Sequence, residues 1–219
     1  VPTYFTRYGK EFTWELKSSL LGFQGRECAD KIIKTLDLPL TVEEFMRQCL
    51  EIYEVFDIMS KVFRLNVTHL DVHNIKTPLS GAQKLVEHLH NKCIPIALAT
   101  SSSKDSVDMK MQNYKDILKL FSHLTMGSTD PQVTKGKPDP AIFVVCASKF
   151  PDKPKPENCL VFEDAVNGLK AGIAANMQVV LVPDPRIDPA QFSGATLVLN
   201  SLEEFQPELF GLPPYNEGL

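Results

Sequence analysis

Three kinds of feature are absent from this sequence, and each absence narrows the range of functions. No apolar run approaches the ~18 residues of a membrane-spanning helix, and no secretory signal opens the chain. There is no run of basic residues, and the net charge of −4 favours neither nucleic acid nor a membrane surface as a partner. The five cysteines form no CxxC pair, so we expect reduced thiols in a cytoplasmic protein.

The composition itself is that of an ordinary soluble globular protein, with 43% apolar and 23% charged residues. A chain of 219 residues can bury one core, or one core with a small appended domain. The sequence pattern changes near residue 77. We therefore expect a helical domain over residues 1–76 and an α/β domain over residues 77–219.

The first region has helical periodicity. The stretch LTVEEFMRQCLEIYEVF opens with Thr41 and Glu44 at the spacing of a capping box. The apolar residues that follow share one helical face; they are Phe45, Cys49, Tyr53 and Phe56. A second helix is predicted over residues 28–36, after a glycine-containing turn. These patterns predict a small all-helical unit.

From residue 77 onward, short apolar runs alternate with helical patterns. The predicted strands are 94–99, 123–127, 159–162, 177–183 and 195–200. The helical patterns between them cover 81–92, 104–121, 140–150 and 165–177. Near-continuous apolar strands separated by helices indicate a parallel sheet covered on both faces. We therefore predict an α/β, Rossmann-like doubly wound fold, which binds ligands at the carboxyl ends of its strands.

Polar residues follow three of these strands. Thr100 and Ser101 follow the first, Lys137 comes after the second, and Glu163 and Asp164 follow the third. Each has an ordinary structural explanation. Thr100 and Ser101 would cap a helix, Lys137 would be a solvated loop lysine, and the acids would begin a helix. We also expect Pro138 and Pro140 in the first turn of the helix that follows Lys137. Taken together they predict one site, because a phosphate needs hydroxyls, amides and a cation, while Mg²⁺ needs carboxylate oxygens.

Three motifs resemble those of the haloacid dehalogenase superfamily of phosphotransferases. IALATSS resembles the second family motif, GKPDP the third, and VFEDAVNGLKAG the fourth, and the match extends over residues 77–200. The preceding helical region resembles the helical cap domain of that superfamily. The stretches RYGKEFTWELKSSLLG and ATLVLNSLEEFQPELFGLPPY resemble the pseudouridine-5′-phosphatase group within it.

The resemblance implies Mg²⁺-dependent hydrolysis of a small phosphorylated metabolite through an aspartyl-phosphate. Pseudouridine 5′-phosphate is the favoured substrate, with sugar phosphates and glycerol phosphate as alternatives. Thr100 and Ser101 would bind the phosphoryl group, and Lys137 would neutralise its charge. Asp164 would bind Mg²⁺, supported by Glu163. Arg26 in the cap would contact the substrate, with an ordinary surface arginine as the alternative.

The first motif of the family, a strand ending in DxDG, does not occur in the 219 residues. It supplies the nucleophile and the general acid, and its strand lies between those that end at Thr100 and Glu163. Three explanations remain open. The motif belongs to the natural protein outside this sequence, which Val1 at the first position favours; the chain is a truncated isoform without hydrolase activity; or another residue replaces the nucleophile.

A second hypothesis is therefore that the protein is not an enzyme. A catalytically inactive isoform would keep the anion and metal pocket and act as a binding or scaffold protein. We expect a monomer, with a dimer or a sheet completed by a partner strand as the alternative.

Overall fold

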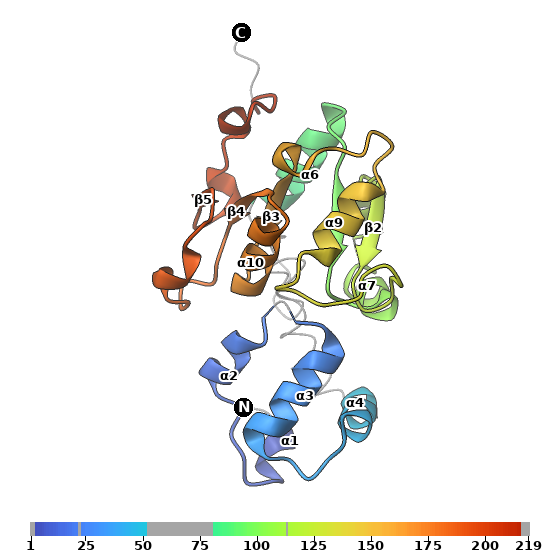
Figure 1. Cartoon of the computed structure of the whole chain (residues 1–219), viewed down its shortest axis with the longest axis vertical. Helices are drawn as coiled ribbons and strands as arrows, with labels where there is room; N and C mark the ends of the chain where they lie inside the picture. The colour runs from blue at the N-terminus through green and yellow to red at the C-terminus, as the bar shows by residue number, and fades with distance from the viewer. Residues whose placement is uncertain (1–2, 22, 52–80, 113, 216–219) are drawn as a thin grey trace.

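The computed structural model describes residues 3–21, 23–51, 81–112 and 114–215. They form a helical unit (residues 3–51) and an α/β unit (residues 81–215), which lie at opposite ends of the molecule in Figure 1. The expected domain boundary at residues 76 and 77 falls outside the described residues. Within the described parts, none of the helices has both the length and the apolar character needed to span a membrane.

The helical unit contains α1 (Thr3–Thr6), α2 (Trp14–Ser19), α3 (Gly25–Leu36) and α4 (Val42–Glu51). The capping box at the start of α4 is confirmed, because Glu44 N–H donates to Thr41 Oγ1 and Thr41 N–H donates to a Glu44 carboxylate oxygen. Helix α3 ends at Leu36, and its cap residue Asp37 adopts the left-handed conformation.

The core of the helical unit is aromatic and aliphatic. Its largest fully buried side chains are Phe5, Phe45, Leu20 and Ile32. The predicted apolar face of α4 is confirmed for Phe45 and Cys49, which are both buried. Tyr53 and Phe56 lie outside the described residues.

The α/β unit contains the five predicted strands. They are β1 (Ala97–Thr100), β2 (His123–Met126), β3 (Leu160–Glu163), β4 (Gln178–Leu181) and β5 (Leu197–Val198). All three pairings, β1 with β2, β3 with β4 and β4 with β5, are parallel. Helix α6 (Ala82–Asn91) precedes β1, and the helices between the strands are α7 (Lys104–Lys110), α8 (Lys115–Leu118), α9 (Ala141–Ser148) and α10 (Val166–Ala174). Short 3₁₀ turns lie at Pro156–Asn158, Pro189–Phe192, Leu202–Glu204 and Pro207–Phe210.

Alternate residues of the strands pack into two different apolar layers. In β4, Val179 and Leu181 pack with residues of α9 and α10, whereas Val180 packs with residues of α6 and the C-terminal 3₁₀ turns. The same alternation occurs in β3, where Val161 faces the first layer and Phe162 the second. Both faces of the sheet are thus covered, as the apolar strand sequences predict.

The strands form two separate sheets rather than one. β1 pairs with β2, and β3 pairs with β4 and β5, but no hydrogen bond joins β1 to β3 within the described residues. The two sheets still share one apolar layer, which includes Ala99 of β1 and Val161 of β3. The break lies between the strands that end at Thr100 and Glu163, where the resemblance places the strand of the missing first motif.

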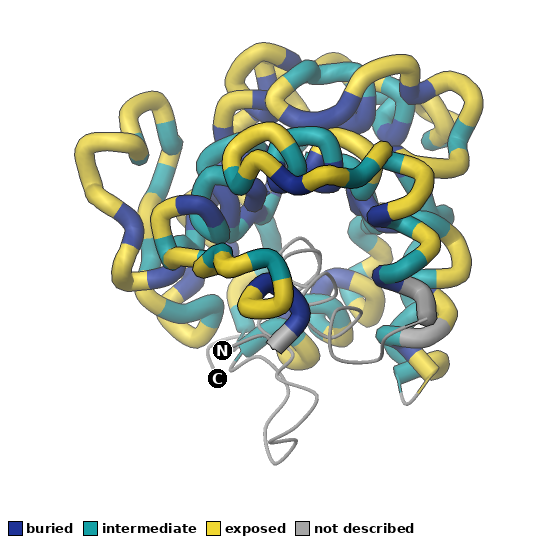
Figure 2. The backbone as a smooth tube through the Cα atoms, turned by 90° about the horizontal axis from the view of Figure 1, so that it is seen from below, coloured by how far each residue is buried: buried dark blue, intermediate teal, exposed yellow. Residues whose placement is uncertain are grey.

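Two local predictions were wrong. The single helix expected over residues 104–121 is divided into α7 and α8, because Tyr114 N–H donates to Met111 C=O in a turn instead of continuing the helix. Pro138 and Pro140 do not lie in the first turn of a helix, since α9 begins only at Ala141 and Pro140 is its cap residue. Figure 2 colours the chain by residue burial and shows exposed residues along the outer loops and on the outer sides of helices.

Candidate active site

A buried ion pair joins Lys137, which follows β2, to Glu163, the last residue of β3. Lys137 is 1% exposed and Glu163 is 7% exposed, and Lys137 Nζ donates to Glu163 Oε1. The Lys137 ammonium also lies 4.8 Å from the centre of the Phe143 ring. Lys137 is therefore not a solvated loop lysine. A buried charge without a partner is costly in free energy. Each of the two side chains is therefore held in place by its contact with the other.

Asp164 follows Glu163 at the end of β3 and carries a shielded carboxylate. Burial, with a further contribution from the negative charge of Glu163, raises the pKa of Asp164 well above its usual value. Lys137 lowers the pKa of Asp164, and Asp184 raises it. Among the described residues, Glu163 Oε2 and Asp164 Oδ2 have no hydrogen-bond partner although both atoms are buried. Two shielded carboxylate oxygens without a donor are what a bound cation would satisfy.

The residues after β1 are also buried. Thr100 is fully buried, and Ser101 and Ser102 are nearly so. The cap of α7 is Ser103, whose hydroxyl accepts from Ser106 N–H, so the alternative that Thr100 or Ser101 caps this helix is wrong. The Thr100 hydroxyl instead accepts from Ser102 N–H at 3.2 Å. Thr100 is the last residue of β1, as Glu163 is the last residue of β3, so the hydroxyls and the acids both lie at the carboxyl end of a strand.

Gly168 is a site residue that the sequence reasoning missed. It lies in α10, one turn after Asp164, and is buried. A Cβ atom at residue 168 would lie 2.0 Å from Glu163 Oε2 and 2.1 Å from Glu163 Cδ. The Glu163 carboxylate therefore occupies the space that any side chain at this position would fill. A glycine inside a helical pattern was the available signal for such a close approach.

The helical unit reaches this edge of the strands through the start of α3. Gln24 Nε2 donates to Gly127 C=O at 2.8 Å, directly after β2. Glu27 lies against Gly136, because a Cβ there would be 2.3 Å from Glu27 Oε2. Gly136 precedes Lys137, so α3 approaches the chain immediately beside the buried lysine.

Arg26 lies on α3 but forms its ion pair within the helical unit. Its guanidinium donates to Glu43 on α4, and the Arg26 side chain is 71% exposed. The structure brings together Lys137, Glu163 and Asp164. The substrate contact expected for Arg26 stays a prediction.

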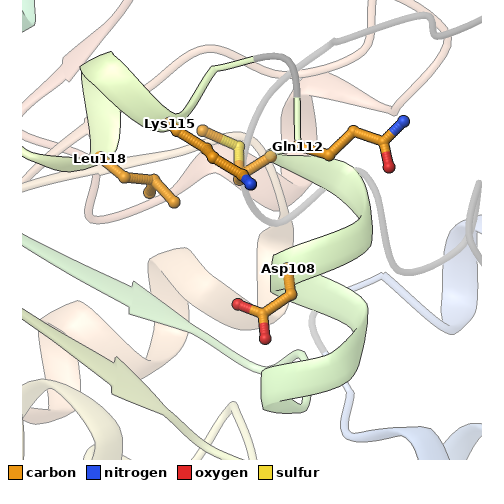
Figure 3. Close-up of a pocket in the computed structure, with 5 residues that line it drawn as sticks. Asp108, Gln112, Lys115 and Leu118 are labelled. Carbon is orange, nitrogen blue, oxygen red and sulfur yellow. The ribbon is translucent and has the colours of Figure 1, made fainter.

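A separate cavity of about 570 Å³ lies along α7 and α8. Figure 3 shows the residues that line it; they are Asp108, Met111, Gln112, Lys115 and Leu118. This cavity is distinct from the candidate site, because Thr100, Ser101, Lys137, Glu163 and Asp164 do not line it.

The donor set fits a divalent cation in part. Glu163 and Asp164 offer hard carboxylate oxygens, which suit Mg²⁺, and Mg²⁺ commonly uses only one or two carboxylates and keeps several waters. No group of three or more metal-binding side chains occurs within residues 3–51 and 81–215, with the gaps given above. The described ligand set is therefore limited to the two carboxylates.

The comparisons with known proteins agree with these features. A family model for haloacid dehalogenase-like hydrolases matches residues 28–176. A probable pseudouridine-5′-phosphatase of Drosophila melanogaster is 40% identical over 210 residues, which cover 96% of this chain and 84% of the relative. A (DL)-glycerol-3-phosphatase 2 of Arabidopsis thaliana is 34% identical over 214 residues, covering 96% of this chain and 82% of the relative.

A solved structure shares the fold. The crystal structure of a β-phosphoglucomutase from Clostridium difficile superimposes with a TM-score of 0.69 at 22% identity, and the match covers 96% of this chain and 85% of that chain. The extent of the family match and the identity to the curated relatives place the protein plainly: the chain belongs to the haloacid dehalogenase-like hydrolase family.

Proposed function

We propose that the site acts in a Mg²⁺-dependent phosphatase of this family, which hydrolyses a small phosphorylated metabolite. The observation that carries the proposal is the buried Lys137–Glu163 pair beside Asp164, with two carboxylate oxygens that no described donor satisfies. A cation at these oxygens and the Lys137 ammonium would together stabilise the charge of a transferring phosphoryl group.

Each residue has a specific role in this proposal. Asp164 Oδ2 would hold Mg²⁺, and Glu163 would use one oxygen to position Lys137 and the other to support the metal. The bound metal would supply additional positive charge to the phosphate oxygens. Lys137 would contact the phosphoryl group and Thr100 would donate its hydroxyl to it, with Ser101 beside it. Arg26 would contact the distal part of the substrate.

The aspartyl-phosphate step needs groups that lie outside these 219 residues. A strand with the DxDG motif, completing the sheet between β1 and β3, would bring its first aspartate to the edge occupied by Thr100 and Asp164. That aspartate would attack phosphorus, and the second would protonate the leaving oxygen. Water would then hydrolyse the acyl phosphate, which releases inorganic phosphate and restores the carboxylate.

The favoured substrate is pseudouridine 5′-phosphate. Relatives named as probable pseudouridine-5′-phosphatases are 40% and 30% identical to this chain. Glycerol 3-phosphate is the second candidate, because two relatives named as glycerol-3-phosphatases are each 34% identical. Phosphate release from both compounds should be measured with Mg²⁺, using this chain extended by a segment that carries the first motif.

The expected result is hydrolysis of pseudouridine 5′-phosphate with a higher kcat/KM than glycerol 3-phosphate. Activity should be lost in Asp164→Ala and kept in Asp152→Ala, whose exposed acid lies in a surface turn. Turnover by the unextended chain would contradict the aspartyl-phosphate mechanism. The second candidate function is a binding protein without turnover, and an extended chain that binds phosphate but hydrolyses neither compound would support it.

A further inference from the structure

A cation–π contact joins the helical unit to the α/β unit. The Arg186 guanidinium carbon lies 3.6 Å from the centre of the Trp14 ring. Trp14 is the first residue of α2, whereas Arg186 lies in the segment after β4. An arginine placed over an indole face at this distance is attracted by the negative face of the ring.

Asp184 fixes the orientation of this guanidinium. Arg186 Nε donates to Asp184 Oδ1 at 2.8 Å, and Arg186 Nη2 donates to Asp184 Oδ2 at 2.6 Å. The Arg186 backbone N–H also donates to Asp184 Oδ1, at 3.0 Å. A two-point pair of this kind holds the guanidinium in one plane, so its face is presented to the indole.

Apolar packing joins the same two parts of the chain. Leu21, just after α2, packs with Ile187 and Ala165, and all three are buried. In addition, Asn167 Nδ2 donates to Leu21 C=O at 2.6 Å. Ala165 directly follows Asp164, so this packing lies beside the acid pair. The negative charge of Asp184 also acts on Asp164.

The buried cluster and the exposed ion pair have different properties. The Arg186 side chain is 61% exposed, whereas that of Asp184 is 9% exposed. An apolar contact is insensitive to moderate salt, but a charged contact open to water weakens as salt screens it. Arg186 is not part of the apolar cluster of Leu21, Ala165 and Ile187, so its replacement leaves that cluster intact.

We propose that Arg186, oriented by Asp184 and stacked on Trp14, is a positioning residue that holds α2 against the α/β unit beside the acid pair. Its removal shifts the helical unit towards an open arrangement. The contact includes none of the proposed catalytic residues, so it can be measured without substrate.

Trp14 provides the measurement, because it is the only tryptophan in the chain. A fluorescent acceptor can be attached to Cys93, which is exposed on the α/β unit, in a Cys159→Ser background. Energy transfer from Trp14 then reports the separation of the two units. Transfer efficiency is taken from donor lifetimes with and without acceptor, so that a changed Trp14 quantum yield does not affect it.

Arg186→Ala should lower the transfer efficiency, with an open-to-closed ratio about two- to thirtyfold higher than in the parent chain. Arg186→Lys keeps the charge but not the planar stack, and should lie between the two. In the parent chain, salt at ~1 M should move transfer in the same direction. Lys34→Ala, which removes an exposed pair with Asp30 on α3, is the matched control and should change nothing.

Acrylamide quenching of Trp14 separates a local effect from the proposed one. If quenching rises in Arg186→Ala while energy transfer stays at the parent value, the arginine only covers the indole and the proposal is wrong. Unchanged transfer in both Arg186 variants would overturn it as well.

Discussion

Gly168→Ala tests whether the shape of α10 positions the Glu163 carboxylate. A Cβ at residue 168 would lie 2.0 Å from Glu163 Oε2, against an ordinary contact of about 3.5 Å, so the carboxylate would move by about 1.5 Å. That displacement breaks its contact with Lys137. Breaking a buried ion pair costs about 3–5 kcal/mol, whereas alanine gains about 1 kcal/mol over glycine in a helix. The expected net loss is therefore about 2–4 kcal/mol in the free energy of unfolding.

Urea unfolding followed by circular dichroism measures this loss. Lys170→Ala, at an exposed position of the same helix, is the control and should stay within about 0.5 kcal/mol of the parent. In a Glu163→Ala background the clash is absent, so Gly168→Ala should be neutral or stabilising there. If Gly168→Ala is as stable as the parent, or if its loss of stability persists without the Glu163 carboxylate, then residue 168 does not position that carboxylate.

Two further predictions follow from burial. Burial raises the pKa of the Cys28 and Cys49 thiols to about 12. Iodoacetamide at pH 8 should therefore leave both thiols unmodified in the native protein, while the exposed Cys93 reacts. Peptide mass spectrometry that finds Cys28 modified before Cys93 would contradict this. The pKa of Asp164 is raised above its usual 3.8, so the folded chain binds more protons than the unfolded chain above that pH, and stability without metal falls as pH rises. Asp164→Asn removes this loss, and its urea midpoint should exceed that of the parent at pH 8 more than at pH 4; an equal difference at both pH values would show that Asp164 is not the group concerned.

The fold was largely predictable because the strands are short apolar runs. All five predicted strands occur, but their ends differ. β1 begins at Ala97 rather than residue 94, and β5 contains only Leu197 and Val198. Apolar residues outside a ladder still pack into a core, as Ile94 and Ile96 do, so hydrophobicity alone does not mark where pairing begins. The division of 104–121 had no such signal, since neither glycine nor proline marks the turn after Met111.

The residues of the candidate site were predictable in kind but not in their contacts. Polar residues after successive parallel strands share one edge of a sheet, which is why Lys137 and Glu163 could be expected to meet. The space at Gly168 and the stacking of Arg186 on Trp14 depend on distances between elements far apart in sequence. Sequence periodicity contains no information on such distances.

The break between β1 and β3 coincides with the position of the first motif. The sequence lacks DxDG, and the described strands leave β1 and β3 unpaired with each other at the place where the resemblance puts that strand. Thr100, Glu163 and Asp164, which would bind phosphate and metal, lie at the carboxyl ends of these two strands. Metal binding can therefore be tested separately from turnover.

A calorimetric titration of this chain with Mg²⁺ measures the role of the acid pair without any catalytic step. We expect one Mg²⁺ site per chain, lost in Asp164→Ala and retained in Asp152→Ala. A chain that binds no Mg²⁺, or one that binds it equally well without the Asp164 carboxylate, would show that Glu163 and Asp164 do not form a metal site.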